Sequence, residues 1–153
     1  MIPIVVRAAS DDDALLLAGF EQALFPEDAW TLAMIREELV SEWSHFVLAY
    51  EDEADGSDPI GYGGVKTVGD DADIMTIGVV ESARGRGAGA QILATLTNEA
   101  KLRGARRVFL EVRESNEAAR RLYEGAGFVE LGRIRNYFRN PNEDAVLMRA
   151  ELG

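Results

Sequence analysis

The stretch from Arg84 to Gly89 contains two arginines and three glycines in six residues, shortly after an apolar, β-branched run that begins at Ile74. Glycines followed by an amphipathic helical pattern predict a strand-to-helix turn whose backbone N–H groups point in one direction. Such a turn favours a phosphate, by about 0.3 to 2 kcal/mol from the helix dipole alone. We therefore predict an anion-binding site here, with Arg84 and Arg86 adding positive charge beside it.

Three phosphate-binding motifs compete for this stretch. A nucleotide P-loop requires Gly-Lys-Ser or Gly-Lys-Thr after the glycines, whereas this chain has Ala90 and Gln91 after Gly89. The dinucleotide pattern G-x-G-x-x-G/A fits from Gly85, with Glu111 within reach of the acidic position ~20 residues downstream. Too little sequence follows for a doubly wound domain, however. The third pattern, Arg/Gln-x-x-Gly-x-Gly/Ala, also matches, and a glycine-rich turn without a ligand is the remaining alternative.

The chain has no cysteine and a single histidine, His45. A disulfide framework, a cysteine nucleophile and a thiolate metal site are thereby excluded. One histidine supports neither a histidine-centred triad nor a multi-histidine metal site, so we expect His45 to be a structural residue at a strand edge and predict no metal. The chemistry must depend on carboxylates, hydroxyls or a cofactor.

Glu111 is the carboxylate best placed for proton transfer. The alternating run Val108–Val112 predicts a strand with Phe109 and Glu111 on the face opposite its aliphatic side chains. Partial burial there raises the pKa of the Glu111 carboxyl toward the range of a general base. An ion pair with Arg107 or Arg113 is the alternative, purely structural role.

Tyr123 carries a hydroxyl on the helix that is predicted to follow the strand of Glu111. It lies in a short helix, Glu117–Glu124, which Asn116 can cap and which Gly127 ends. Its hydroxyl can face the same cleft as Glu111, or the ring can belong to the core.

The remaining elements follow from hydrophobic periodicity. Ser10 and Asp13 resemble a capping box at the start of the first helix, and Asp28 is predicted to cap a second helix that extends to Val40. The strand after the glycine-rich helix is expected to lie parallel to the strand before it. The other predicted elements are strands 4–7, 45–50, 60–68 and 72–79, a helix 87–102, and a final hairpin of strands 128–136 and 145–151.

Length and charge limit the function classes. With 153 residues, 47% of them apolar, residues 1–153 are predicted to form a single domain. The net charge of −11 argues against a nucleic-acid partner and is compatible with a basic or amine-bearing substrate. No apolar run approaches the ~18 residues of a membrane span, so a cytoplasmic location is expected.

Several motifs together resemble a known family, the GNAT N-acetyltransferases, and among them the RimI-type ribosomal-protein alanine N-acetyltransferases. The third phosphate pattern above is similar to the acetyl-CoA pyrophosphate loop of that family. The motifs that carry the resemblance are Thr76–Val79, Arg84–Gly89, Leu110–Asn116, Leu122–Phe128 and Arg135–Phe138, together with Phe25-Pro26 followed by Trp30.

The resemblance implies a mixed α/β (α+β) fold, with a mostly antiparallel sheet of about seven strands and about four flanking helices. It also implies that Glu111 is the general base and Tyr123 the general acid. Acetyl-CoA is then expected to contact Ile77, Gly78, Val79, Arg84, Gly85, Arg86, Gly87, Ala88, Gly89, Ala90 and Asn116.

The implied acceptor is the N-terminal alanine of a basic ribosomal protein, with Phe25, Trp30 and Tyr137 contacting it. Two positions depart from the family pattern: Phe138 follows Tyr137 where paired tyrosines are usual, and Ala90 stands where a basic residue is common. Acetylation of a small-molecule amine is the nearest alternative function. An acyl-CoA sensor and a dinucleotide-dependent oxidoreductase are the more distant ones.

Overall fold

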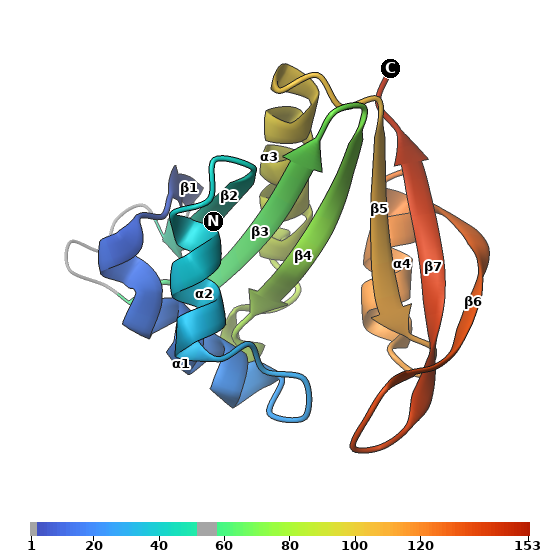
Figure 1. The fold of residues 1–153 in the computed structure, drawn as a ribbon. Coiled ribbons are helices and arrows are strands. Elements are labelled where there is room, and N and C mark those ends of the chain that lie inside the picture. Colours follow the sequence, from blue (N-terminus) through green and yellow to red (C-terminus); the bar gives the residue numbers. More distant parts are fainter. Residues whose placement is uncertain (1–2, 52–57) are drawn as a thin grey trace.

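The computed structural model describes residues 3–51 and 58–153, which form a mixed sheet flanked by helices (Figure 1). Seven strands lie in the order β1-β2-β3-β4-β5-β7-β6, and every neighbouring pair is antiparallel except β4 and β5. The predicted fold class is confirmed. The strands are β1 (Ile4–Ala8), β2 (Ser44–Glu51), β3 (Gly61–Val68), β4 (Asp71–Val79), β5 (Arg107–Arg113), β6 (Val129–Phe138) and β7 (Glu143–Glu151).

Helices cover both faces of the sheet. Helices α1 (Ala14–Leu24) and α2 (Leu32–Leu39) lie over one face, whereas α3 (Ala88–Leu102) and α4 (Glu117–Gly125) lie over the other (Figure 1). Each layer has its own core. Ile92, Leu93 and Leu96 of α3 are buried against the sheet in one core, and Leu17 and Ile35 of α1 and α2 belong to the other.

Strands β4 and β5 pair over only three residues. Asp71–Asp73 pairs with Arg107–Phe109 in parallel, as predicted for a strand-helix-strand connection, and no pairing is found beyond Asp73. From this shared end the two strands diverge (Figure 1). The divergence leaves the backbone and side chains of both strands free to line a cavity in the middle of the sheet.

The alternation predicted for β5 is also found. Val108, Leu110 and Val112 are buried in the α3 layer, so Glu111 and Arg113 point to the opposite face of the strand. The chemistry-bearing side chains of β5 therefore face the side of the sheet that α1 and α2 cover.

The predicted start of the second helix is wrong. Helix α2 begins at Leu32, and the Thr31 side chain caps it by accepting a 3.1 Å hydrogen bond from the Met34 N–H. Asp28 instead pairs with Arg113, because its carboxylate lies within 2.8 Å of that guanidinium. The capping box does form, with the Ser10 N–H donating to Asp13, but residues 11–13 form a 3-10 turn before α1 begins.

The single histidine, the lengths of the helices and the connection after β2 can also be compared with the predictions. His45 lies in β2 beyond the residues that β1 covers, and burial lowers its pKa. None of the described helices has the length and apolarity needed to cross a membrane. The connection between the predicted strands 45–50 and 60–68 falls mostly on residues 52–57, outside the described residues.

Candidate active site

The glycine-rich turn adopts the predicted strand-to-helix geometry. Gly85 and Gly87 have φ values of +81° and +84°, a region that side chains other than glycine rarely adopt. The first regular hydrogen bond of α3 runs from the Gln91 N–H to the Gly87 carbonyl over 3.0 Å. The three N–H groups that precede Gln91 therefore have no partner within the helix, which is the arrangement that binds an anion.

The two arginines of the turn have different surroundings. Arg84 donates from Nε to the Val79 carbonyl over 3.2 Å, which ties the turn to the end of β4. Arg86 forms a 2.8 Å ion pair with Glu51 at the end of β2. The side chain of Arg86 is thus directed to the end of β2, and part of the positive charge expected beside the turn is balanced by Glu51.

A cavity of about 540 Å³ lies against the turn; we call it the α3 cavity. Ten of the eleven residues predicted to contact the cofactor line it, and Arg86 is the exception. Leu122 of α4 also lines it, and a Cβ atom added to Gly89 would come within 3.3 Å of that leucine. The ten residues are Ile77, Gly78, Val79, Arg84, Gly85, Gly87, Ala88, Gly89, Ala90 and Asn116.

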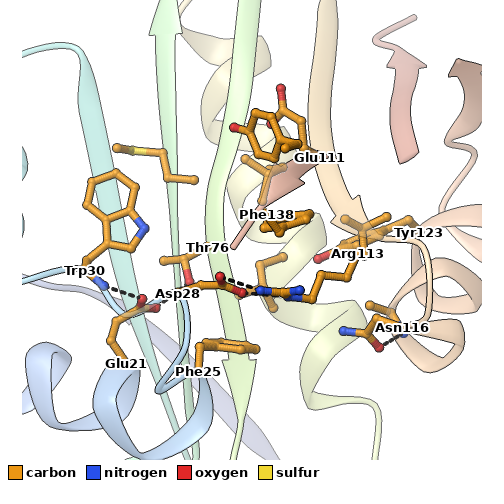
Figure 2. Close-up of a pocket in the computed structure, with 16 residues that line it drawn as sticks. Glu21, Phe25, Asp28, Trp30, Thr76, Glu111, Arg113, Asn116, Tyr123 and Phe138 are labelled. Atoms are coloured by element: carbon orange, nitrogen blue, oxygen red, sulfur yellow. Dashed lines mark hydrogen bonds and ion pairs between the residues drawn. The ribbon is translucent and has the colours of Figure 1, made fainter. Parts of the chain in front are cut away.

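A second cavity, of about 270 Å³, lies where β4 and β5 diverge; we call it the β4–β5 cavity (Figure 2). Phe25 and Trp30, from the connection between α1 and α2, form one wall together with Glu21 of α1. Tyr137 of β6 also lines the cavity. The three residues predicted to contact an acceptor are thus brought to one cavity from segments far apart in the chain.

Glu111 lines the β4–β5 cavity and is half-buried. Burial, and secondarily the charge of Asp73, raise the pKa of its carboxyl. The two arginines that could have paired with it have other partners: Arg107 binds Asp71, and Arg113 binds Asp28 and Glu143. Within the described residues, Glu111 therefore does not form the ion pair with Arg107 or Arg113 that was its structural alternative. Its carboxylate faces the cavity.

Tyr123 lines both cavities and is 8% exposed. Burial raises the pKa of its hydroxyl to about 12, so the group stays protonated at neutral pH and can donate a proton or a hydrogen bond. Its ring packs at a tilt against Phe128, with the centroids 5.9 Å apart. Asn116 also lines both cavities while capping α4, because its Oδ1 accepts a 3.1 Å hydrogen bond from the Ala119 N–H.

Arg113 joins the two walls of the β4–β5 cavity, a role that the sequence did not reveal (Figure 2). Its guanidinium donates two hydrogen bonds to Asp28, at 2.9 and 2.8 Å. On the opposite side it donates to Glu143 and to the carbonyls of Arg139 and Pro141, and it stacks over Phe138. All five guanidinium N–H donors are thereby used.

Within the described residues, no group of three or more histidine, aspartate or glutamate side chains is arranged to hold a metal ion. The site consists of one cavity at a helix N-terminus and one in a divergent sheet. Five residues line both cavities: Phe25, Ile77, Asn116, Ala119 and Tyr123.

This arrangement agrees with a family assignment. Residues 14–128 match the sequence model of the acetyltransferase (GNAT) family, and the chain belongs to that family. It is an acetyl-CoA-dependent N-acetyltransferase.

Comparison with individual proteins narrows the class to the RimI type. The chain is 36% identical to N-alpha-acetyltransferase RimI of Mycobacterium tuberculosis, over 99% of this chain and 94% of that protein. The crystal structure of the ribosomal-protein-S18-alanine N-acetyltransferase from Escherichia coli has a TM-score of 0.85 at 25% identity and covers 99% of this chain and 95% of its own. Arabidopsis thaliana NAA60 in complex with acetyl-CoA shares the fold, with a TM-score of 0.86 at 20% identity over 98% of this chain and 99% of its own.

Proposed function

We propose that this protein transfers the acetyl group of acetyl-CoA to the N-terminal α-amine of a ribosomal protein that begins with alanine. The similar E. coli enzyme is named for that residue and for ribosomal protein S18, and the M. tuberculosis relative is named an N-alpha-acetyltransferase. The net charge of −11 favours a basic acceptor. An acceptor of this kind implies a cytoplasmic enzyme.

One observation carries the proposal: the two cavities meet at Tyr123, while Glu111 lines only the β4–β5 cavity. A thioester that enters from the α3 cavity and an amine that enters from the β4–β5 cavity would meet beside Tyr123. The base then lies on the amine side and the acid at the junction, which is the separation that an acyl transfer between two substrates requires.

The α3 cavity fits the cofactor. The free N–H groups at the start of α3 and the left-handed Gly85 and Gly87 suit a pyrophosphate, and the NAA60 structure of the same fold binds acetyl-CoA. Ile77, Gly78 and Val79 line the cavity where β4 has left β5, so their backbone groups would be available to the acetyl and pantetheine parts. Acetyl-CoA supplies the activated acetyl group.

Glu111 accepts the proton that the ammonium group loses, directly or through one water molecule, while the amine nitrogen bonds to the carbonyl carbon. The carbon–sulfur bond would then break as Tyr123 donates its proton to the departing thiolate, and the second proton that the acylated nitrogen loses would restore the Tyr123 hydroxyl through solvent. An α-amine with a pKa near ~8 is partly neutral already, so a carboxylate of moderately raised pKa suffices as the base.

Phe25, Trp30 and Tyr137 bind the first residues of the acceptor in this proposal. Phe25 and Trp30 come from the connection between α1 and α2 and Tyr137 from β6, and the loop that carries Phe25 and Trp30 is held at Trp30 by Glu21 and at Asp28 by Arg113. A cavity of about 270 Å³ suits a short N-terminal residue better than a large one.

The test is acetyl transfer from acetyl-CoA to short peptides that begin with Ala, Ser, Met or Gly, with spermidine and aryl amines alongside. Mass spectrometry locates the acetyl group. We expect the Ala peptides to react fastest and only at the α-amine. Reaction of small amines alone would overturn the acceptor assignment, and acetyl-CoA binding without any transfer would favour a sensor.

A further inference from the structure

Glu21 is a buried carboxylate that the proposed chemistry does not use. It lies in α1, is 2% exposed and lines the β4–β5 cavity. None of the ion pairs in the described part of the chain includes it. Burial of a carboxylate without a cation is costly unless hydrogen bonds compensate, so its partners are informative.

Three donors from three segments satisfy Glu21. The Trp30 backbone N–H donates to Oε1 over 3.1 Å, and the hydroxyls of Tyr62 and Thr76 each donate to Oε2 over 2.6 Å. Burial and the charge of Glu21 raise the pKa of Tyr62, so its hydroxyl remains a donor. Hydrogen bonds to a charged acceptor are roughly twice as strong as neutral ones.

Two of these donors line the β4–β5 cavity from different elements, Trp30 from the loop after α1 and Thr76 from β4. Trp30 lies in the wall of the β4–β5 cavity, and its N–H and the Thr76 hydroxyl reach Glu21 from opposite sides (Figure 2). Thr76 immediately precedes Ile77–Val79, the part of β4 that lines the α3 cavity. The Tyr62 ring packs against the same strand, because it occupies the space that a Cβ atom at Gly78 would need.

We propose that Glu21 is a positioning residue. It fixes the loop that carries Phe25 and Trp30, the wall that contacts the acceptor, relative to Ile77–Val79, the segment of β4 beside the proposed thioester. The inference depends on the proposed function, which assigns the acceptor to the β4–β5 cavity. Attack on the acetyl carbon requires the amine within about 3 to 3.5 Å, and a displacement of about 1 Å lowers the rate by about 100-fold. One carboxylate bonded to the wall and to β4 restricts that displacement.

The experiment compares Glu21→Gln with Glu38→Gln. Glu38 makes a matched control because its carboxylate, on α2, also accepts hydrogen bonds, from Ser44 and Lys66, and it lines neither cavity. Initial rates are measured with an Ala peptide and acetyl-CoA at a temperature where circular dichroism shows every variant folded. CoA affinity is measured separately by calorimetry.

We expect Glu21→Gln to lower kcat/KM for the peptide by about 10- to 100-fold, with the CoA dissociation constant within about twofold of wild type. Glu38→Gln should change neither quantity by more than about twofold. Equal losses of kcat/KM in both variants, or none in Glu21→Gln, would overturn the positioning role.

Thr76→Val and Thr76→Ser keep the proposal testable if Glu21→Gln does not fold. Thr76→Val removes the hydroxyl that bonds Glu21 to β4, and Thr76→Ser keeps a hydroxyl at the same position of the cavity lining. We expect kcat/KM for the peptide to fall in Thr76→Val and to recover in Thr76→Ser. Equal kcat/KM in the two variants would contradict the positioning role of Glu21. Wild-type protein that acetylates no peptide would instead overturn the proposed function, and that outcome is seen before any variant is compared.

Discussion

The α3 cavity and the β4–β5 cavity are built in different ways. Most of the α3 cavity comes from one continuous stretch, the end of β4 and the glycine turn, with α4 closing one side. The β4–β5 cavity takes its lining from α1, the connection to α2, β4, β5, α4 and β6. Four glycines line the first cavity and none lines the second. A cofactor common to a whole family suits the first arrangement, and an acceptor particular to one enzyme suits the second.

Because the α3 cavity and the β4–β5 cavity are lined by different elements, we expect substitutions in the two cavities to affect different kinetic constants. Those in the β4–β5 cavity should change turnover or the acceptor KM, and those at the turn should change acetyl-CoA binding. Tyr123, which lines both, should act mainly on turnover.

The largest effect is expected for Glu111→Gln, which keeps the shape of the side chain and removes the base. We expect kcat to fall by about 10² to 10⁴-fold with an unchanged dissociation constant for acetyl-CoA. Steady-state rates and calorimetry test the two parts. Unchanged turnover would remove Glu111 from the role of base.

Tyr123→Phe should lower kcat by about 10 to 10²-fold, because a water molecule can partly replace a general acid. The raised pKa of about 12 for Tyr123 means that its proton is present throughout the neutral range. Acetyl-CoA affinity should stay within about twofold of wild type, since only the hydroxyl is lost. A lower affinity with unaltered kcat would contradict the acid role.

Gly87→Ala should raise the KM for acetyl-CoA by about tenfold, since a Cβ atom at positive φ costs about 1 to 2 kcal/mol and distorts the turn. Gly104→Ala is the control, because Gly104 has a φ of +99° and lines neither cavity. Both variants should lose a few degrees of Tm. An equal change of KM in the two would show that the turn has no special role.

Asp28→Asn should raise the acceptor KM by about two- to fivefold, because it weakens one attachment of the loop that carries Phe25 and Trp30. Arg113 keeps its contacts to the β6–β7 hairpin in this variant. Asp71→Asn, which breaks the ion pair to Arg107 at the closed end of the gap, is the control. A change in acetyl-CoA affinity instead of acceptor KM would show that the two cavities are not separable here.

The smallest effect concerns pH. Glu111 must be ionised to accept a proton, so activity should decrease as the pH falls through its pKa, which burial and then Asp73 raise. Asp73→Asn removes the second cause, lowers the pKa of Glu111 and should move the acidic limb of the pH profile of kcat/KM to lower pH. If the acidic limb moves to higher pH, or does not move, a group other than Glu111 controls it.

Much of the fold follows from periodicity along the chain. Alternation in β5, the amphipathic pattern of α3 and the cap at Asn116 are properties of neighbouring residues, and the structure confirms all three. The start of α2 was predicted wrongly because Asp28 is a good helix cap by type, yet its carboxylate is bound by an arginine 85 positions away. Such a partner cannot be identified from local sequence.

The glycine turn, the strand that carries Glu111 and the helix that carries Tyr123 can be predicted from local sequence, because each depends on residues a few positions apart. The surroundings of these elements depend on how distant segments pack. The bonds from Tyr62 and Thr76 to Glu21 join residues 41 and 55 positions apart, and they depend on how β3 and β4 lie against α1. Side-chain contacts over such distances are set by the packing of elements, which no local pattern specifies.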